Sequence, residues 1–479
     1  MTHDPQEATG QAWSALGGAP RLLERVSYGR PGAGLPARLP VRELARATVA
    51  VCSLAAAELA ARRTGRPVPA VRVDDGAVAT SFTSERHLRI GGREPVNFAP
   101  LSGFWRAADG WVRTHANYPH HRARLLACLG IRDNGQDTEL AGQLAAVVGE
   151  LPAEEIQERV YAAGGLAVAV RTAEQWARHP AGRAAAAEPL VRARRLDGAP
   201  RRPARPLPDG ALLPGAGVRV LDLTRVIAGP VAGRTLALLG ADVLRIDSPR
   251  LPESADAHAD TGFGKRSARL DLAHQPDRAV FDELLDTADV VLLGYRPGAL
   301  DRLGLSAAAL LERQPGLVVA ELGAWGHQGP WARRRGFDSL VQAATGIAMA
   351  QAGPDGRPGA LPAQALDHGT GHLVAAAVLR ALTEQHDTGG GAWLRFSLAA
   401  TGHWLTHGLS ARAADDEDGY EPYDPARHLA RADAPIGRLV HALPPVSFVG
   451  GPANWACPPG RWGADQPVWV QPLSRIRYP

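Results

Sequence analysis

Cysteine is scarce in this sequence. The three residues, Cys52, Cys128 and Cys457, lie far apart and form no C-x-x-C pair. Such spacing excludes a disulfide framework and the common zinc sites, and it is typical of a reducing compartment. Because the first residues also lack a basic stretch followed by an apolar one, we expect no signal peptide and a cytoplasmic protein without a bound metal.

Long apolar runs and lysine are lacking too. No run of about 18 residues is free of charge, so no membrane-spanning segment is predicted. Lys265 is the only lysine, and the net charge of +4 comes from arginines spread along the chain. No basic stripe with interleaved aromatic residues is present, which argues against nucleic-acid binding. A small anionic ligand that carries phosphates suits this balance of charge.

Short apolar runs alternate with amphipathic stretches after residue 217. Strands are predicted at residues 218–224, 241–247, 289–295 and 316–325, with helices among them. This alternation is typical of β-α-β units with parallel strands. We therefore predict an α/β fold in which a doubly wound, mostly parallel, Rossmann-like sheet occupies the C-terminal half.

The N-terminal half lacks this alternation and predicts a smaller α+β domain. Pro, Gly and Arg are dense over residues 194–217, which marks a boundary. The expected division is residues 1–200, a linker over 201–216, the Rossmann-like domain over 217–410, and an irregular C-terminal segment over 411–479 that packs on that domain.

Two segments resemble each other at a constant offset of 324 residues, with Thr388 on Thr64. Each predicts a helix, a Thr-Gly turn and a strand. Under this offset Asp367 matches Glu43 and His372 matches Thr48. The similarity indicates a partial duplication, with chance likeness between two Ala-rich helices as the alternative.

Two short stretches before residue 270 carry groups suited to anions. The turn "RVIAGP" joins a strand to a helix, where backbone N–H groups face a ligand in many α/β sheets. The alternative is a plain turn with Pro230 at the first helical position. In "GFGKRSARLDL", Lys265 and Arg266 suit phosphate contact, or else belong to a solvated loop.

Asp367 stands in "QALDHGTGHLVAAAVLRAL", just before a long helix predicted to begin near Thr370. Its carboxylate suits a helix N-cap. It also suits a covalent nucleophile for acyl groups. Gly369 and Gly371 would then permit close backbone approach to a tetrahedral oxyanion.

These stretches resemble the family III coenzyme A transferases, which include formyl-CoA and carnitine-CoA transferases and acyl-CoA racemases. The matching pieces occur in the family's order from Gly217 to about Leu409 and are "GVRVLDLTRVIAGPVAGRTLALLGADVLRID", "GKRSARLDL", "ADVVLLGYRPGALDRLGL", "GAWGHQGPWARRRGFDSLVQAATG" and "LDHGTGHLVAAAVLRALTEQHDTGGGAWLRFSLA". Weaker likeness covers the front half, whose residues 109–131 and 158–183 resemble the family's small domain.

The resemblance implies a CoA transferase that moves CoA from an acyl-CoA thioester to a carboxylic acid. Asp367 matches the aspartate that carries the covalent intermediates. Residues that match CoA contacts are Ile227, Ala228, Leu270, Asp271, Tyr295, Arg296, Arg302 and Arg335. CoA is then a substrate, and acyl-CoA and carboxylic acids are the expected partners. Family members form interlocked dimers, so we expect either a homodimer or an intramolecular pseudo-dimer.

The sequence departs from the family in several places. Gly294 replaces an Asn, and Ser248 stands where a basic residue holds the adenosine phosphate, although Arg250 could substitute. Phe337 replaces the His of the racemases, which favours transfer over racemisation. The domain order is rearranged, and Glu43 lacks the glycines near Asp367, so we expect Glu43 to be inert.

Two other functions remain open: a CoA-thioester racemase or isomerase, and a non-catalytic CoA-binding paralogue. Two further groups of residues are weaker candidates for site residues. The histidines of "NYPHHR", residues 117–122, are expected to be polar surface residues and not metal ligands. Trp325 and His327 either line the acyl pocket or pack in the core.

Overall fold

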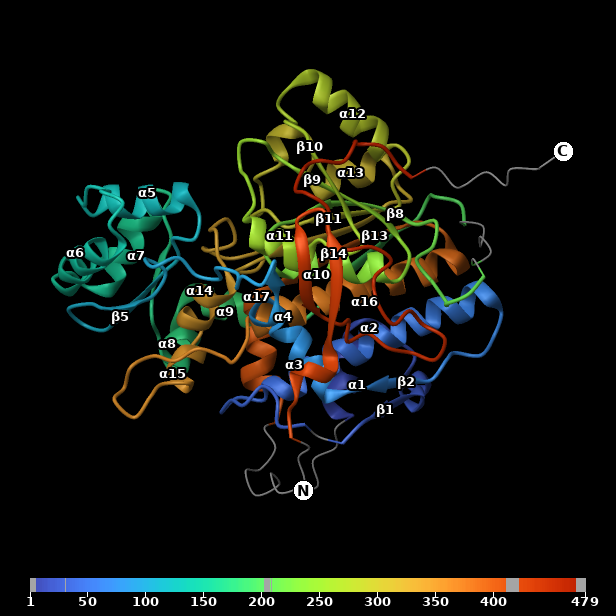
Figure 1. The fold of residues 1–479 in the computed structure, drawn as a ribbon, viewed down its shortest axis with the longest axis horizontal. Helices are drawn as coiled ribbons and strands as arrows, with labels where there is room; N and C mark the ends of the chain where they lie inside the picture. Colours follow the sequence, from blue (N-terminus) through green and yellow to red (C-terminus); the bar gives the residue numbers. More distant parts are fainter. Residues whose placement is uncertain (1–5, 31, 202–206, 208, 411–421, 471–479) are drawn as a thin grey trace.

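The computed structural model describes residues 6–30, 32–201, 207, 209–410 and 422–470. A seven-stranded sheet lies at its centre, in the order β10-β9-β8-β11-β12-β13-β7 (Figure 1). All neighbouring strands are parallel except β13 and β7. The strands are β7 (Arg192–Leu196), β8 (Arg219–Leu223), β9 (Asp242–Asp247), β10 (Arg266–Arg269), β11 (Val290–Leu293), β12 (Val318–Gly323) and β13 (Gly391–Ser397). The mostly parallel sheet predicted for the C-terminal half is confirmed.

Helices cover both faces of this sheet. One face packs on α10 (Ala228–Leu238) and α16 (Ala365–Thr388), and the other on α12 (Gln275–Leu285) and α13 (Ala307–Arg313). Val220 of β8 belongs to the first apolar layer and the next residue to the second. Side chains alternate between faces along a strand, so a strand buried on both sides is mostly apolar.

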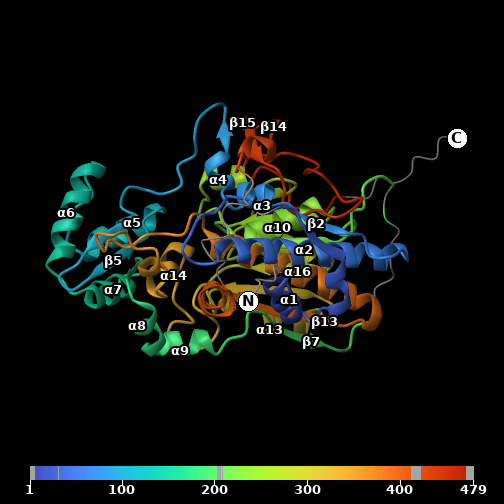
Figure 2. The ribbon, with the colours of Figure 1, turned by 90° about the horizontal axis from the view of Figure 1, so that it is seen from below.

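A second long helix, α2 (Val41–Thr64), lies beside α16 (Figure 2). The two helices have the same length, and adding 324 to the bounds of α2 gives those of α16. A Cβ on Gly369 would lie 2.6 Å from Leu44 Cδ2, so the missing side chain allows the helices to approach closely. α2 is long and apolar enough to cross a membrane, yet 89% of its apolar window is buried in this structure.

A small lobe, residues 101–169, extends from one end of the sheet (Figure 1). It has a separate apolar core in which Leu125, Leu140 and Ile156 are fully buried. Its elements are β4 (Phe104–Arg106), β5 (Trp111–Thr114), α5 (Pro119–Cys128), α6 (Asp137–Gly149), α7 (Ala153–Ala162) and β6 (Ala167–Ala169).

The remaining elements connect these parts. The N-terminal ones are α1 (Glu7–Ala15), η1 (Pro20–Arg25), β1 (Val26–Tyr28), β2 (Val71–Val73), α3 (Asp75–Phe82), α4 (Ser84–His87), β3 (Arg89–Ile90), α8 (Ala173–Arg178) and α9 (Pro180–Ala186). The others are α11 (Ala255–Thr261), η2 (Asp301–Leu303), α14 (Asp338–Ala344), α15 (Ile347–Ala350), α17 (Leu398–His403), η3 (Trp404–Gly408), η5 (Pro425–His428), β14 (Leu429–Ala434) and β15 (Gly437–Ala442).

Two regions differ from the expected division of the chain. Residues 192–196, at the expected boundary, form β7 and complete the large sheet by pairing with β13. The C-terminal segment, expected to be irregular, contains the β14–β15 hairpin, and β15 also pairs with β3 from the N-terminal half. Backbone pairing therefore ties the two halves together. Parts of the predicted linker, residues 202–206 and 208, and of the C-terminal segment, residues 411–421 and 471–479, lie outside the described residues.

Candidate active site

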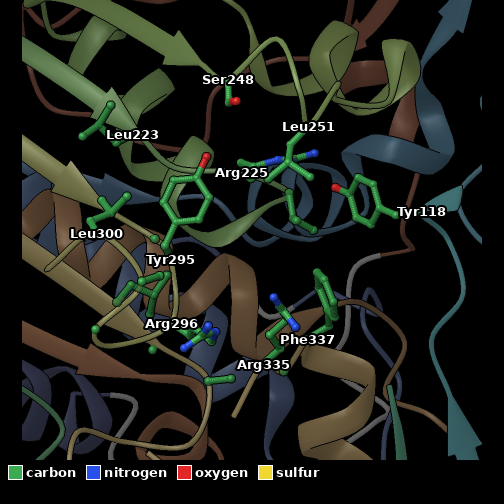
Figure 3. Close-up of a pocket in the computed structure, with 18 of the residues that line it drawn as sticks. Tyr118, Leu223, Arg225, Ser248, Leu251, Tyr295, Arg296, Leu300, Arg335 and Phe337 are labelled. Atoms are coloured by element: carbon green, nitrogen blue, oxygen red, sulfur yellow. The ribbon is translucent and has the colours of Figure 1, made fainter. Parts of the chain in front are cut away.

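A cavity of about 750 Å³ opens where the strands of the large sheet end. Residues at or just after the carboxyl ends of five strands line it: Leu223, Ser248, Leu270, Tyr295 and Ala324. The small lobe supplies another wall through residues at and near the start of α5, including Tyr118 (Figure 3). Ligands of open α/β sheets bind at the carboxyl ends of strands, so the cavity has the position of a ligand site.

Most of the site residues predicted from the sequence meet in this cavity. The ones that line it are Ala228, Leu270, Asp271, Tyr295, Arg296, Arg302, Arg335 and Asp367. Ile227 is absent from the lining, and it is the N-cap residue of α10. Residues from strands and helices distant in sequence thus converge on one space.

Asp367 is at the inner wall of the cavity and is only 6% exposed. It lies in the first turn of α16, which begins at Ala365 and not near Thr370 as expected. The N-cap residue is Gln364, so the N-cap alternative for Asp367 is wrong. The Asp367 backbone N–H donates to Asp338 Oδ2 at 2.9 Å. This bond brings two carboxyl groups together at the head of the helix.

The surroundings of Asp367 disfavour its charged form. Burial raises the pKa of Asp367 well above its ordinary value, and the nearby Asp338 and Glu85 carboxylates raise it further. Burial also raises the pKa of Asp338 to about 6, although the Asp367 N–H and Gln342 oppose that change. An ionised Asp367 is therefore held at a cost in free energy, and a reaction that removes its charge relieves that cost.

The glycines of α16 serve packing and do not open toward a ligand. A Cβ on Gly369 would meet Leu44 of α2, and a Cβ on Gly371 would lie 2.5 Å from the Ala228 carbonyl oxygen of α10. α16 can therefore approach both helices only because these side chains are missing. The expectation that the glycines expose amides to an oxyanion finds no space here.

Arginine dominates the charge around the cavity. Its lining includes Arg124, Arg225, Arg250, Arg296, Arg302, Arg334 and Arg335. Three of these pair with carboxylates 2.6 to 3.5 Å away. Among the described residues, no ion pair reaches Arg124, Arg296, Arg302 or Arg335. Burial, with Arg296 and Arg124 nearby, lowers the pKa of Arg335. Four uncompensated guanidinium groups around one space favour a ligand with several negative charges.

The site residues lie in a part of the chain that matches a known protein family. A family model described as CoA-transferase family III matches residues 216–434. This part of the chain is thus similar to CoA-transferase family III. The matched range includes Asp367 and every sequence-predicted site residue, whereas the small-lobe wall of the cavity lies outside it.

Individual relatives agree with this family. The chain is 37% identical over 186 residues to "Probable fatty acyl-CoA transferase Rv3272" of Mycobacterium tuberculosis. The aligned region covers 36% of this chain and 47% of the relative. The chain is 29% identical over 282 residues to "Formyl-CoA:oxalate CoA-transferase" of Streptomyces coelicolor, covering 54% and 66%. A crystal structure of Rv3272 is 35% identical, with a TM-score of 0.39, and covers 41% of this chain and 57% of that one. The chain spans about half the length of the curated relatives that it matches.

The "RVIAGP" turn lies inside the range that the family model matches and has an unusual backbone conformation. Val226 has a φ of 71°, which is rare for a β-branched residue, and its side chain lies at the cavity. Its N–H donates to Glu253 Oε2 at 3.2 Å, and Glu253 is fixed in turn by Arg245 and Tyr118. Strain of this kind costs about 1–3 kcal/mol and recurs at functional sites.

Lys265 bonds to the start of α10, just after this turn, and does not line the cavity. It is buried, pairs with Asp222 at 3.0 Å and donates to the Pro230 carbonyl at 3.1 Å. Both sequence interpretations, phosphate contact and a solvated loop, are therefore wrong. A buried lysine remains charged only beside such partners, so Lys265 and Asp222 act as a structural pair.

The small-lobe wall is the part that the sequence interpretation missed. The "NYPHHR" histidines were expected on the surface, but His121 is only 3% exposed and lines the cavity with Tyr118 and His120. His115 stacks on Phe337 at 3.8 Å between ring centroids. Burial lowers the pKa of His115 to about 3 and of His121 to about 2. Pro119 at the first helical position was the available signal for a helix here.

The other weighed residues have clear places. Trp325 packs edge-on against Trp331 in the core, and His327 bonds the Phe396 carbonyl at 3.1 Å, so packing explains both. Arg250 lies at the rim and pairs with Asp271 at 2.6 Å, beside Ser248. A Cβ on Gly294 would lie 3.1 Å from Thr224 Cβ, which explains the missing side chain there.

Proposed function

We propose that this protein is a CoA transferase that moves CoA from an acyl-CoA thioester to a carboxylic acid through covalent intermediates on Asp367. One observation carries the proposal: a buried carboxyl group lies in the same cavity as four arginines that form no ion pair with the described carboxylates. The relatives are named as CoA-transferases with oxalate, succinate, malate or glutarate.

Three of these four arginines suit the phosphates of CoA. Arg296 and Arg302 follow β11, and Arg335 is close enough to Arg296 for its pKa to be lowered by it (Figure 3). Phosphate oxygens accept bidentate hydrogen bonds from guanidinium groups, which accounts for arginine in place of lysine. The apolar lining from Leu223, Leu270 and Leu300 suits the uncharged parts of the ligand.

The chemistry follows from the environment of Asp367. One Oδ atom attacks the thioester carbonyl, the C–S bond breaks, and a mixed anhydride and the CoA thiolate result. The thiolate attacks the aspartyl carbonyl, which releases the donor acid and leaves an aspartyl-CoA thioester. The acceptor carboxylate then attacks this thioester, which frees the thiolate and forms a second mixed anhydride on Asp367. The thiolate attacks the carbonyl of the acceptor, the anhydride C–O bond breaks, and the new acyl-CoA and the Asp367 carboxylate result. Each covalent state of Asp367 is neutral, so burial beside Asp338 and Glu85 favours leaving the ionised ground state.

A CoA-thioester racemase or isomerase is the second candidate, because Asp338 and Asp367 adjoin and both have raised pKa values. Such a pair could move a proton at the carbon next to the thioester. Phe337 argues against it, since it stacks on His115 and offers no second base at that position. Exchange of the α-proton with deuterated solvent, without CoA transfer to added acids, would favour this candidate.

The contact between α2 and α16 supports an intramolecular pseudo-dimer over a homodimer. α2 packs beside α16 in the same chain and matches its length, and the small lobe from the N-terminal half forms one wall of the cavity of the C-terminal half. One chain would then hold one complete site. A mass from light scattering that equals a single chain would support this proposal. A cytoplasmic location and activity without a metal are separate parts of the proposed function.

Intact-mass spectrometry tests the proposed function directly. We expect an acyl or CoA adduct after mixing with a panel of acyl-CoAs, sensitive to hydroxylamine and located on Asp367 by peptide mapping. Asp367→Asn should form none. Glu43→Gln, which removes the carboxylate at the matching position of α2, is the control and should form the adduct normally. Tight CoA binding without any adduct or turnover would instead favour the non-catalytic paralogue.

A further inference from the structure

The wall of the cavity formed by α5 carries an unusual concentration of positive and proton-accepting groups. His120, His121 and Arg124 lie within five residues of one helix, and all three line the cavity. Arg335 lines it as well and is close enough to Arg124 for the pKa of Arg335 to be lowered by it. No ion pair links a carboxylate to these four residues in the described part of the chain.

His121 is the most informative member of this wall. It is 3% exposed, and neither of its ring nitrogens has a hydrogen-bond partner in the structure. Its neighbours are rings: His120 at 4.0 Å, Tyr118 at 5.7 Å and Phe337 at 6.0 Å between centroids. Buried polar groups are nearly always bonded, so two unpartnered nitrogens beside a cavity indicate a ligand group that completes them.

The charges around this wall agree with an anion as that group. Burial, together with the nearby His120, His115, Arg335 and Arg124, lowers the pKa of His121 to about 2. The pKa of His120 is lowered by burial and by Arg124, Arg225 and Arg335. Burial and the nearby arginines therefore keep these imidazoles neutral. An anion placed among them would reverse the field and gain several charge-assisted hydrogen bonds.

The nearby carboxylates are already committed elsewhere. Glu253 accepts from Tyr118 and pairs with Arg245. Asp133 and Asp137 pair with Arg122. None of them can neutralise the α5 wall without breaking these pairs. We therefore expect the ligand to supply the negative charge that balances this wall.

The position of the wall indicates which part of the ligand carries that charge. His121 contacts Phe337, and the residue after Phe337 is Asp338, whose carboxylate accepts the Asp367 N–H at 2.9 Å. The wall is thus only a few side chains from the proposed nucleophile. In CoA the long pantetheine arm separates the phosphates from the reacting sulfur. A charge on the acyl group lies much closer to the reacting carbon than the phosphates do.

We propose that the α5 wall, with Arg124, His120 and His121, binds a second carboxylate carried by the acid substrate, so that this enzyme uses dicarboxylic acids. The inference rests on the proposed CoA-transferase function and specifies its acid. Arg335 lies at the junction of this subsite and Arg296, on the side where CoA phosphates are proposed to bind.

A matched pair of acceptors tests the subsite. Succinate and butyrate have chains of equal length and differ by one carboxylate. We expect succinate to have the higher kcat/KM, and Arg124→Gln to lower that value by about 10- to 100-fold, the effect of losing a hydrogen bond to a charged group. His121→Asn should act in the same direction. The kcat/KM for butyrate and the KM for acyl-CoA should not change.

Arg122→Gln is the matched control on the same helix. Arg122 pairs with Asp133 and Asp137 and does not line the cavity, so its loss should leave the preference for succinate intact. A rise in the KM for acyl-CoA with both acids in Arg124→Gln would assign the wall to a CoA phosphate and overturn the inference. Equal use of the two acids by the unaltered enzyme would overturn it as well.

Direct binding separates this inference from the proposed function. Calorimetric titration of succinate and butyrate into the full chain with CoA present reports the subsite without turnover. Succinate binding that is lost in Arg124→Gln supports the subsite even if no adduct forms on Asp367. An Asp367 adduct without any preference between the acids supports the transferase and contradicts the subsite.

Discussion

α2 and α16 have the same length and a constant offset, yet only one of them carries chemistry. Asp367 of α16 is buried at a cavity beside Asp338, whereas Glu43 of α2 is half-buried and lines no part of it. Two and four residues further along, α16 has Gly369 and Gly371, where α2 has Ala45 and Ala47. An acidic residue at a helix start therefore becomes reactive through its neighbours. Small residues on the helix determine which neighbours can approach it.

The strongest contrast between α16 and α2 is expected in catalysis. Asp367→Asn should lower the CoA-transfer rate by at least about 1,000-fold, as removal of a covalent nucleophile does elsewhere. Glu43→Gln should change it by less than about twofold. Initial rates of acyl-CoA formation with succinate measure both variants. A comparable loss in the two would show that the helices share the chemistry and would contradict the contrast drawn here.

A smaller effect is expected on stability. A Cβ at Gly371 would lie 2.5 Å from the Ala228 carbonyl oxygen, and backbone cannot move aside easily. Gly371→Ala should therefore destabilise the protein by about 1–3 kcal/mol despite the better helix propensity of Ala. Gly369→Ala should cost less, because the Cβ there meets the end of the Leu44 side chain. Denaturant unfolding followed by circular dichroism gives the change.

The reverse exchange on α2 serves as the control for these variants. Ala47→Gly removes a side chain at the position that matches Gly371, and it should cost only the propensity difference of about 1 kcal/mol plus a small cavity. If Gly371→Ala proved neutral, close contact between α16 and α10 would not be the reason for the glycine.

The sheet and the position of Asp367 could be predicted because their signals are local. Alternation of apolar strands and amphipathic helices depends on neighbouring residues, and it placed every predicted strand of the large sheet correctly. The motif around Asp367 is continuous in sequence. The match of the bounds of α2 and α16 likewise bears out the offset of 324 residues.

The features that could not be predicted depend on contacts distant in sequence. Lys265 was interpreted as either a phosphate contact or part of a solvated loop, because its partner Asp222 lies 43 residues away. Gly369 was assigned to substrate approach because Leu44 of α2 is far along the chain. His121 was placed on the surface because nothing local shows that the small lobe folds back on the sheet ends. In each case tertiary packing, not the residue type, determined the role.

The smallest effect concerns pH. Glu85 of α4, in the N-terminal half, raises the pKa of Asp367 together with burial and Asp338, while Glu85 itself lies 3.7 Å from His368 Nε2. Glu85→Gln removes one negative neighbour, so the pKa of Asp367 should fall. Ionised Asp367 would then persist to lower pH, and the acidic limb of the kcat/KM profile should move down, raising the rate at pH 6 by a few-fold, or about 1 kcal/mol. Glu94→Gln, an exposed carboxylate paired with Arg89, should leave the profile in place. An acidic limb that stayed fixed, or moved to higher pH, would show that Glu85 does not act on Asp367 through its charge.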